Sequence, residues 1–232
     1  VYRTKEEMTA TIQMHDKQGS LQTLQRHKPT HPEKTLGMLV APDGSMEAFK
    51  PDDAGEQIRV GQIPYLHEKA KEFTTKIKSA QNTLPNDARV AITSTTMKTL
   101  ECPMTALTVT KQGWDKMMKP LLRGCLPVAG YSQNFPRAVT FGPSEQGGKG
   151  LMHPWHKQAL THSETLWEEL ASKRHTGEFI TTSMEALHLE LGCPTSLMSV
   201  PFDRMAGCTT DSWLTSLWET CDKWNIDIKS IA

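Results

Sequence analysis

Leu121–Gly150 reads LLRGCLPVAGYSQNFPRAVTFGPSEQGGKG, and this stretch separates helical sequence before it from helical sequence after it. Gly124 and Pro127 predict the end of the preceding helix, because glycine frees the backbone and proline lacks the N–H. Pro136–Phe141 ends in the strand-favouring triplet VTF and predicts one short strand. Gly147–Gly150 predicts a loop that lets another backbone come close.

Basic residues concentrate in this stretch and in the helix predicted before it. Between Lys111 and Lys149 there are six basic and two acidic residues, a net charge of 6 − 2 = +4. The six are Lys111, Lys116, Lys119, Arg123, Arg137 and Lys149. Between Glu178 and Lys229 there are three basic and eight acidic residues, a net charge of 3 − 8 = −5, and the whole chain is neutral. The basic stretch is suited to a polyanion; a solvated helix face is the alternative.

Periodic apolar residues predict mainly helices along the rest of the chain. The predicted helices cover residues 64–81, 86–108 with a division at Pro103, 110–125 with Thr110 as N-cap and an interruption at Pro120, 155–173, 178–191 with Gly192 as C-cap, and a last one capped by Thr210 or Asp211. The predicted strands are a half-buried hairpin over 10–24, a strand over 35–40, a second hairpin completed by 45–49, and a final strand over 226–231; 50–61 is predicted as a polar loop.

Three segments of the chain share their order and spacing with one family of enzymes. They are LP..GYSQNFPRAVTFGP..QGGKGL at residues 126–151, KTLGMLVAPDG at 34–44, and DSWLTSLW at 211–218. Together they resemble the region after the polymerase palm in reverse transcriptases of retrotransposons from diatoms and related algae. The resemblance extends over most of the chain, between residues 30 and 230.

The resemblance implies a predominantly helical α+β fold in three parts. Residues 1–50 would be the end of the palm, 58–130 a helical thumb-like domain, and 131–232 a C-terminal α+β extension. Short N-terminal β-hairpins would precede the helices. The strand over 35–40 resembles the primer grip, where Gly37 would allow close approach of the primer backbone.

The resemblance also implies a function in RNA-directed DNA synthesis, as the part that holds the primer–template duplex through backbone contacts without sequence preference. The expected partners are an RNA template with its DNA primer and the fingers and palm of the polymerase, with no membrane. The expected nucleic-acid-binding residues are Leu36, Gly37, Lys111, Lys116, Lys119, Arg123, Arg137, Gly148 and Lys149. No catalytic residue, metal site or cofactor is expected in this part, since Mg²⁺ would bind in the palm. A non-catalytic helical scaffold derived from a degenerate element is the alternative.

Other residue patterns favour structural roles over chemistry. Asp52–Asp53 follows a proline in a polar loop, which favours a loop or N-cap over a Mg²⁺ site. Three nearby histidines have no Cys or carboxylate at ligand spacing, which favours packing or surface roles; they are His153, His156 and His162. Gly147–Gly150 lacks the spacing of a phosphate-binding P-loop. Among six tryptophans, Trp114, Trp167, Trp213 and Trp218 lie on apolar helix faces and are expected in the core, whereas Trp155 and Trp224 are less constrained.

The cysteines predict where in the cell the protein is found. Five cysteines without a CxxC pair predict reduced thiols and hence an intracellular protein, cytoplasmic or nuclear. No apolar run approaches the roughly 20 residues that span a bilayer. The first residue is Val1, from which we expect a piece of a longer protein.

Overall fold

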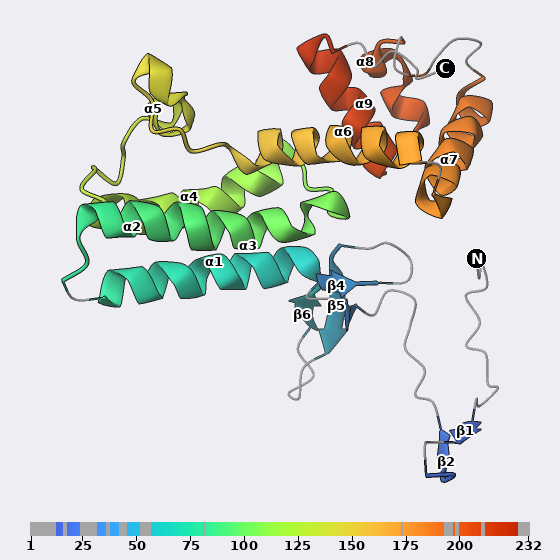
Figure 1. Ribbon diagram of the computed structural model, residues 1–232, viewed down its shortest axis with the longest axis horizontal. Helices are drawn as coiled ribbons and strands as arrows, with labels where there is room; N and C mark the ends of the chain where they lie inside the picture. Colours follow the sequence, from blue (N-terminus) through green and yellow to red (C-terminus); the bar gives the residue numbers. More distant parts are fainter. Residues whose placement is uncertain are drawn as a thin grey trace.

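A computed structural model gives the fold of the chain (Figure 1). The structure describes residues 13–15, 18–23, 32–35, 38–41, 46–51, 57–80, 82–172, 174–192, 197, 200–209 and 212–226. It is a predominantly helical α+β fold with short antiparallel strands near the N-terminus, which confirms the predicted fold class.

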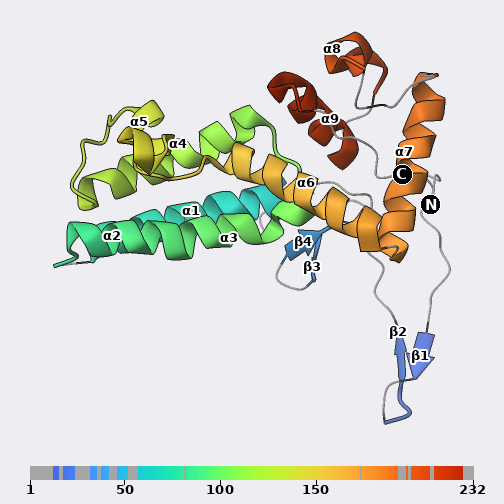
Figure 2. The ribbon, with the colours of Figure 1, turned by 45° about the horizontal axis from the view of Figure 1, so that its top comes forward.

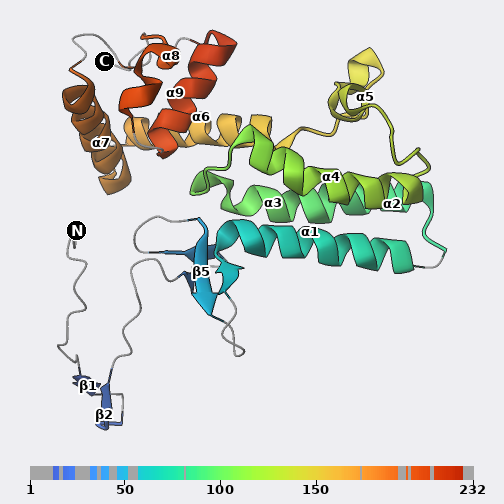
Figure 3. The ribbon, with the colours of Figure 1, turned by 180° about the vertical axis from the view of Figure 1, so that it is seen from behind.

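Within the described ranges, six short strands form three separate antiparallel pairs. β1 (Gln13–His15) pairs with β2 (Leu21–Thr23), β3 (Glu33–Thr35) with β4 (Met38–Val40), and β5 (Ala48–Pro51) with β6 (Gln57–Val60). The β1–β2 hairpin confirms the first predicted hairpin, but its strands are exposed rather than half-buried. In Figure 1 it lies apart from the helices, whereas β4–β6 lie at the start of α1 (Figures 1 and 3).

Three predictions for the N-terminal strands are wrong, and one of them is the hairpin that 45–49 was expected to complete, since β5 pairs with β6. The single strand expected over 35–40 is two strands, because Thr35 pairs with Met38 in the β3–β4 hairpin. The polar loop expected over 50–61 contains the last two residues of β5 and all of β6. In β6, Ile58 and Val60 alternate with polar residues, and this period of two is a strand signal that the polar composition concealed.

A helical bundle follows the strands. It contains α1 (Gln62–Ser79), α2 (Pro85–Ala91) continued by the π-helical turn η1 (Ile92–Met97) and α3 (Lys98–Glu101), the 3₁₀ turn η2 (Cys102–Thr105), and α4 (Lys111–Val128). Thr110 caps α4 as predicted, its side chain accepting a hydrogen bond from the Gly113 N–H. The apolar face of α4 fills the first hydrophobic cluster with fully buried side chains; they are Trp114, Met117, Met118, Leu121 and Leu122.

α4 does not end where the sequence predicts. It runs through Pro120, Gly124 and Pro127 to Val128. Both prolines are exposed, so the carbonyls left without a partner face water and the helix continues. Gly124 is buried against α1, where a Cβ would overlap the Thr74 side chain. The glycine therefore serves close helix packing, and the burial of α4 offsets its low helix propensity of about 1 kcal/mol.

α5 (Arg137–Phe141) replaces the strand predicted over 136–141. Pro136 precedes the helix, and the Thr140 N–H and hydroxyl both donate to its carbonyl at 2.9 and 3.0 Å. These local bonds override the strand propensity of the VTF triplet. The 3₁₀ turn η3 (Ser144–Gln146) follows.

α6 (Pro154–Ser172) runs from beside α4 to α7 (His175–Leu191; Figure 2) and connects two hydrophobic clusters of the described residues. Trp155 packs against the first cluster, and Leu166 belongs to the second. The second cluster also includes residues of α7 and α9 (Trp213–Trp224), with α8 (Phe202–Met205) and the 3₁₀ turn η5 (Ala206–Cys208) beside them. Trp167, expected in the core, is 57% exposed, since one residue along a helix turns the side chain away from the stripe that buries Leu166.

The C-terminal part agrees only partly with the sequence-based predictions. Gly192 caps α7 as predicted, whereas Ser212 caps α9 in place of Thr210 or Asp211. The described residues after 131 contain helices and no strand, and residues 227–231 of the final predicted strand lie outside them. No helix in the described ranges combines the length and apolar composition needed to cross a bilayer.

Candidate nucleic-acid interface

The solvent side of α4 carries three basic residues. Lys116, Lys119 and Arg123 are exposed and lie on one side of the helix, opposite its core-facing residues. At 3.6 residues per turn, their side chains point within about 60° of one another. No acidic side chain among the described residues forms an ion pair with any of the three. We call Lys116, Lys119, Arg123 and the neighbouring Arg137 the basic face.

Arg137 joins this surface from a different element. It begins α5, and it lies close enough to Arg123 for the two positive charges to interact. Burial, followed by the charge of Arg123, lowers the pKa of the Arg137 guanidinium. Its Nη1 atom is buried and has no hydrogen-bond partner in the described structure. The two positive charges thus influence each other, and within the described part of the chain neither forms an ion pair with an acidic side chain.

Lys111, at the start of α4, lies in a different environment. Its Nζ is 3.9 Å from Oδ2 of Asp115, and Oδ1 of the same carboxylate is 3.1 Å from Nε2 of His153. Burial lowers the pKa of His153, and the hydrogen bond to Asp115 opposes this shift. The charge of Lys111 is therefore partly balanced, in contrast to the basic face.

Lys149 belongs to a cluster of cations and aromatic rings beyond the end of α4. Its Nζ lies 5.0 Å from the ring centre of Tyr131 and 5.9 Å from that of Phe135, and the Arg89 guanidinium lies 4.8 Å from the Tyr131 ring centre. Cation–π contacts of this kind orient the two cations without neutralising them. Arg89 is absent from the sequence-based set because it lies on α2, and no local pattern ties it to Tyr131.

Gly148 serves the shape of the loop. Its N–H donates to the Pro143 carbonyl at 2.9 Å, and the next two N–H groups bond Val139 and Gly142. A Cβ at Gly148 would overlap the Gly142 backbone, so the close contact requires glycine. With its N–H already used inside the protein, Gly148 has no backbone donor left for a phosphate.

The other candidate residues either lie outside the described part of the chain or have a structural role there. Leu36, Gly37, Asp52 and Asp53 lie outside the described residues. Within the described part of the chain, no group of three His, Cys, Asp or Glu side chains could hold a metal ion. Among the histidines, His162 is buried in the core, where its Nε2 bonds the carbonyls of Met104 and Leu107.

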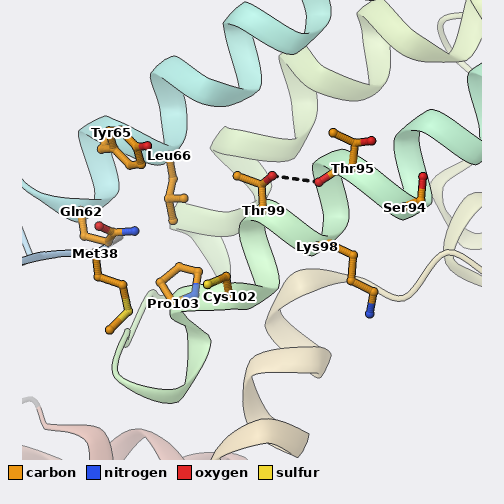
Figure 4. A pocket seen from close by; sticks show the side chains of 10 residues that line it. All are labelled: Met38, Gln62, Tyr65, Leu66, Ser94, Thr95, Lys98, Thr99, Cys102 and Pro103. Carbon is orange, nitrogen blue, oxygen red and sulfur yellow. Dashed lines mark hydrogen bonds between the residues drawn. The ribbon is translucent and has the colours of Figure 1, made fainter. Parts of the chain in front are cut away.

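A pocket of about 450 Å³ opens where β4, α1 and α3 meet (Figure 4). Its wall includes Thr99, whose hydroxyl donates to the Thr95 carbonyl at 2.9 Å. Lys98 at its rim lies 2.6 Å from Glu101 and is therefore paired. None of the residues of the basic face lines this pocket.

Comparison with known proteins found no similar protein. No protein-family model, no curated protein and no solved structure matches the chain.

Proposed function

We propose that this chain binds the sugar–phosphate backbone of nucleic acid through the basic face. The observation that carries the proposal is the row of exposed basic residues on one side of α4, Lys116, Lys119 and Arg123, which have no ion pair to an acidic side chain among the described residues. Arg137 of α5 lies near enough for its charge to interact with that of Arg123. Guanidinium groups donate planar, bidentate hydrogen bonds to phosphate oxygens. A bound phosphate would relieve the repulsion between the charges of Arg123 and Arg137.

The spacing of the charges along α4 supports a strand of phosphates rather than a single anion. From Lys116 to Arg123 the helix rises by about 10 Å, at 1.5 Å per residue. A nucleic-acid strand advances about 3.4 Å per phosphate, so this length spans roughly three phosphates. Contacts of this kind fix position and affinity and carry no sequence information.

The sequence resemblance supports a more specific form of the proposal. In it, the chain is the post-palm part of a retroelement reverse transcriptase, the bound duplex is an RNA template with its DNA primer, and the remaining partner is the rest of the polymerase inside the cell. The chain alone would then not polymerise, because the metal-binding carboxylates belong to the palm. Template-dependent nucleotide incorporation by the isolated chain would contradict this form.

The alternative is a helical scaffold without a nucleic-acid role. Direct binding separates the two functions. We expect the chain to bind a fluorescently labelled RNA–DNA duplex at low salt, measured by anisotropy. Arg123→Ala/Arg137→Ala should weaken binding about tenfold or more, since hydrogen bonds to charged groups each contribute about 1.5–3 kcal/mol.

A lysine on α1 provides the matched control. Lys71 is exposed and forms no ion pair among the described residues, so Lys71→Ala removes a positive charge that does not belong to the basic face. We expect it to change affinity little. An equal loss in the control would show that only overall charge matters, and absence of binding at low salt would favour the scaffold.

A further inference from the structure

A continuous row of aromatic rings runs from α5 to the end of α9. Phe141 contacts His153 with ring centres 4.7 Å apart, and His153 lies 5.8 Å from His156. His156 lies 5.2 Å from Trp155 and 5.3 Å from Trp224, and the two tryptophans are also 5.3 Å apart. We call these five residues the aromatic row.

The row begins beside the basic face. Phe141 and Arg137 are four residues apart on α5, a spacing that places both side chains on one side of the helix. Further along the row, His153 contacts Asp115 of α4. The row therefore connects the arginine pair with the region near the start of α4.

The members of the row differ in exposure. His153 is only 8% exposed and links its neighbours. His156 is exposed, and Trp155 and Trp224 are partly exposed, so the far end of the row is open to solvent. Burial and the charge of Lys111 lower the pKa of His156, which favours the neutral ring at pH 7.

We propose that the open end of the aromatic row, formed by Trp155, His156 and Trp224, stacks the unpaired bases of a single-stranded nucleic acid whose phosphates lie on the basic face. This inference rests on the proposed function, because the basic face supplies the phosphate contacts. Single-strand binders combine a positively charged track with aromatic rings on which successive bases stack. In a duplex the base faces are already stacked on one another. The open end of the row would therefore stack the bases of a single strand and not those of a duplex.

The contacts within the row also have a structural role that does not need a ligand. Trp155 packs against the first hydrophobic cluster, and its contact with Trp224 joins the end of α9 to the start of α6. For this reason Trp155 is kept unchanged in the test, and the substitutions are made at His156 and Trp224.

The test compares two single-stranded probes of the same length, oligo(dT) and an oligonucleotide whose sites are all abasic. Both carry the same phosphates, and only the first has bases. We expect the chain to bind oligo(dT) about tenfold or more tightly than the abasic probe, the size of effect that stacking gives. His156→Ala and Trp224→Leu should each reduce this preference and leave the affinity for the abasic probe unchanged.

Trp167→Leu is the matched control, because Trp167 is an exposed tryptophan of α6 outside the row. It should leave the preference for oligo(dT) unchanged. Equal binding of both probes by the unmodified chain would overturn the stacking inference and leave phosphate binding intact. Absence of binding to either probe at low salt would overturn this inference, and the duplex assay then decides the proposed function separately. The comparison on the unmodified chain decides the matter even if a variant does not fold.

Discussion

At the scale of single residues, Gln158 uses both polar ends of its side-chain amide to hold the start of α4. Its Oε1 accepts hydrogen bonds from the Val109 N–H and from Trp114 Nε1, both at 3.0 Å, and its Nε2 donates to the Val109 carbonyl at 3.2 Å. The side chain is 2% exposed, so water cannot replace these partners. Gln158 thereby fixes α6 against the helix that carries most of the basic face.

Gln158→Leu should lower the free energy of unfolding by about 3 kcal/mol or more, because each buried polar group left without a partner costs about 1–3 kcal/mol. Urea denaturation measures the change. Gln112→Leu, at an exposed position on α4, is the control and should change stability little. A loss below 1 kcal/mol for Gln158→Leu would mean that Val109 and Trp114 find other partners.

His162 makes stability depend on pH. Burial lowers its pKa from 6.5 to about 4, and its Nε2 bonds the carbonyls of Met104 and Leu107 at 2.9 and 3.1 Å. Between pH 6.5 and 4 the unfolded chain binds a proton at this position that the folded chain does not. The stability contributed by neutral His162 is therefore complete above pH 6.5 and falls by about 3 kcal/mol as the pH falls to 4.

The measurement is the free energy of unfolding at neutral pH and near pH 4.5 for the unmodified chain and for His162→Gln, in which the amide keeps a donor for the two carbonyls. The variant should lose less stability on acidification. His175→Gln, at a fully exposed histidine, should behave like the unmodified chain. The same acid sensitivity in all three proteins would contradict this role of His162.

At the scale of elements, the packing of α4 on α1 depends on the absence of a side chain at Gly124. A Cβ there would overlap the Thr74 side chain, and Thr74 is held in place because its hydroxyl donates to the Ala70 carbonyl at 2.7 Å. Gly124→Ala should destabilise the fold by about 1–3 kcal/mol through overpacking, although alanine is the better helix former.

A double-mutant cycle separates overpacking from other effects. Thr74→Ala removes the overlapping methyl group, so Gly124→Ala should cost less in the Thr74→Ala background than in the unmodified chain. The measurement is the melting temperature and the free energy of unfolding of all four proteins. Costs that simply add would show that Thr74 is not the group that Gly124 accommodates.

The elements also show which parts of the fold are predictable from sequence. The buried face of α4 follows from its period, since Trp114, Met117, Met118, Leu121 and Leu122 recur at three- and four-residue steps. The end of the helix cannot be predicted from the local sequence. Gly124 leaves room for the side chain of Thr74, a residue fifty positions earlier. The helical form of α5 does not follow from sequence either, because the bonds of Thr140 to Pro136 depend on backbone geometry rather than on propensity.

The candidate site, too, is predictable from sequence only in part. The basic residues of α4 follow from composition and helical spacing. The pairing of Arg123 with Arg137 does not, because it depends on how the chain turns between α4 and α5. Arg89 and the ring contacts of Trp155 with Trp224 join parts of the chain that no local pattern relates.

At the scale of the whole molecule, two hydrophobic clusters of the described residues share the long helix α6. The first cluster supports α4 and with it most of the basic face. The aromatic row crosses from α5 to α9, so the candidate interface includes elements beside both clusters. Binding would therefore depend on how α6 positions the elements around the two clusters, and not on one helix alone.

The most direct test of phosphate binding is the salt dependence of affinity for a duplex. The logarithm of the binding constant should fall linearly with the logarithm of the salt concentration, with a slope of about −2 to −4 for a few phosphate contacts. In Arg123→Ala/Arg137→Ala the slope should become shallower by about 2, because each lost contact removes about 0.9. An unchanged slope in the double variant would contradict the assignment of these arginines to phosphates, and salt-independent binding would contradict the proposed function.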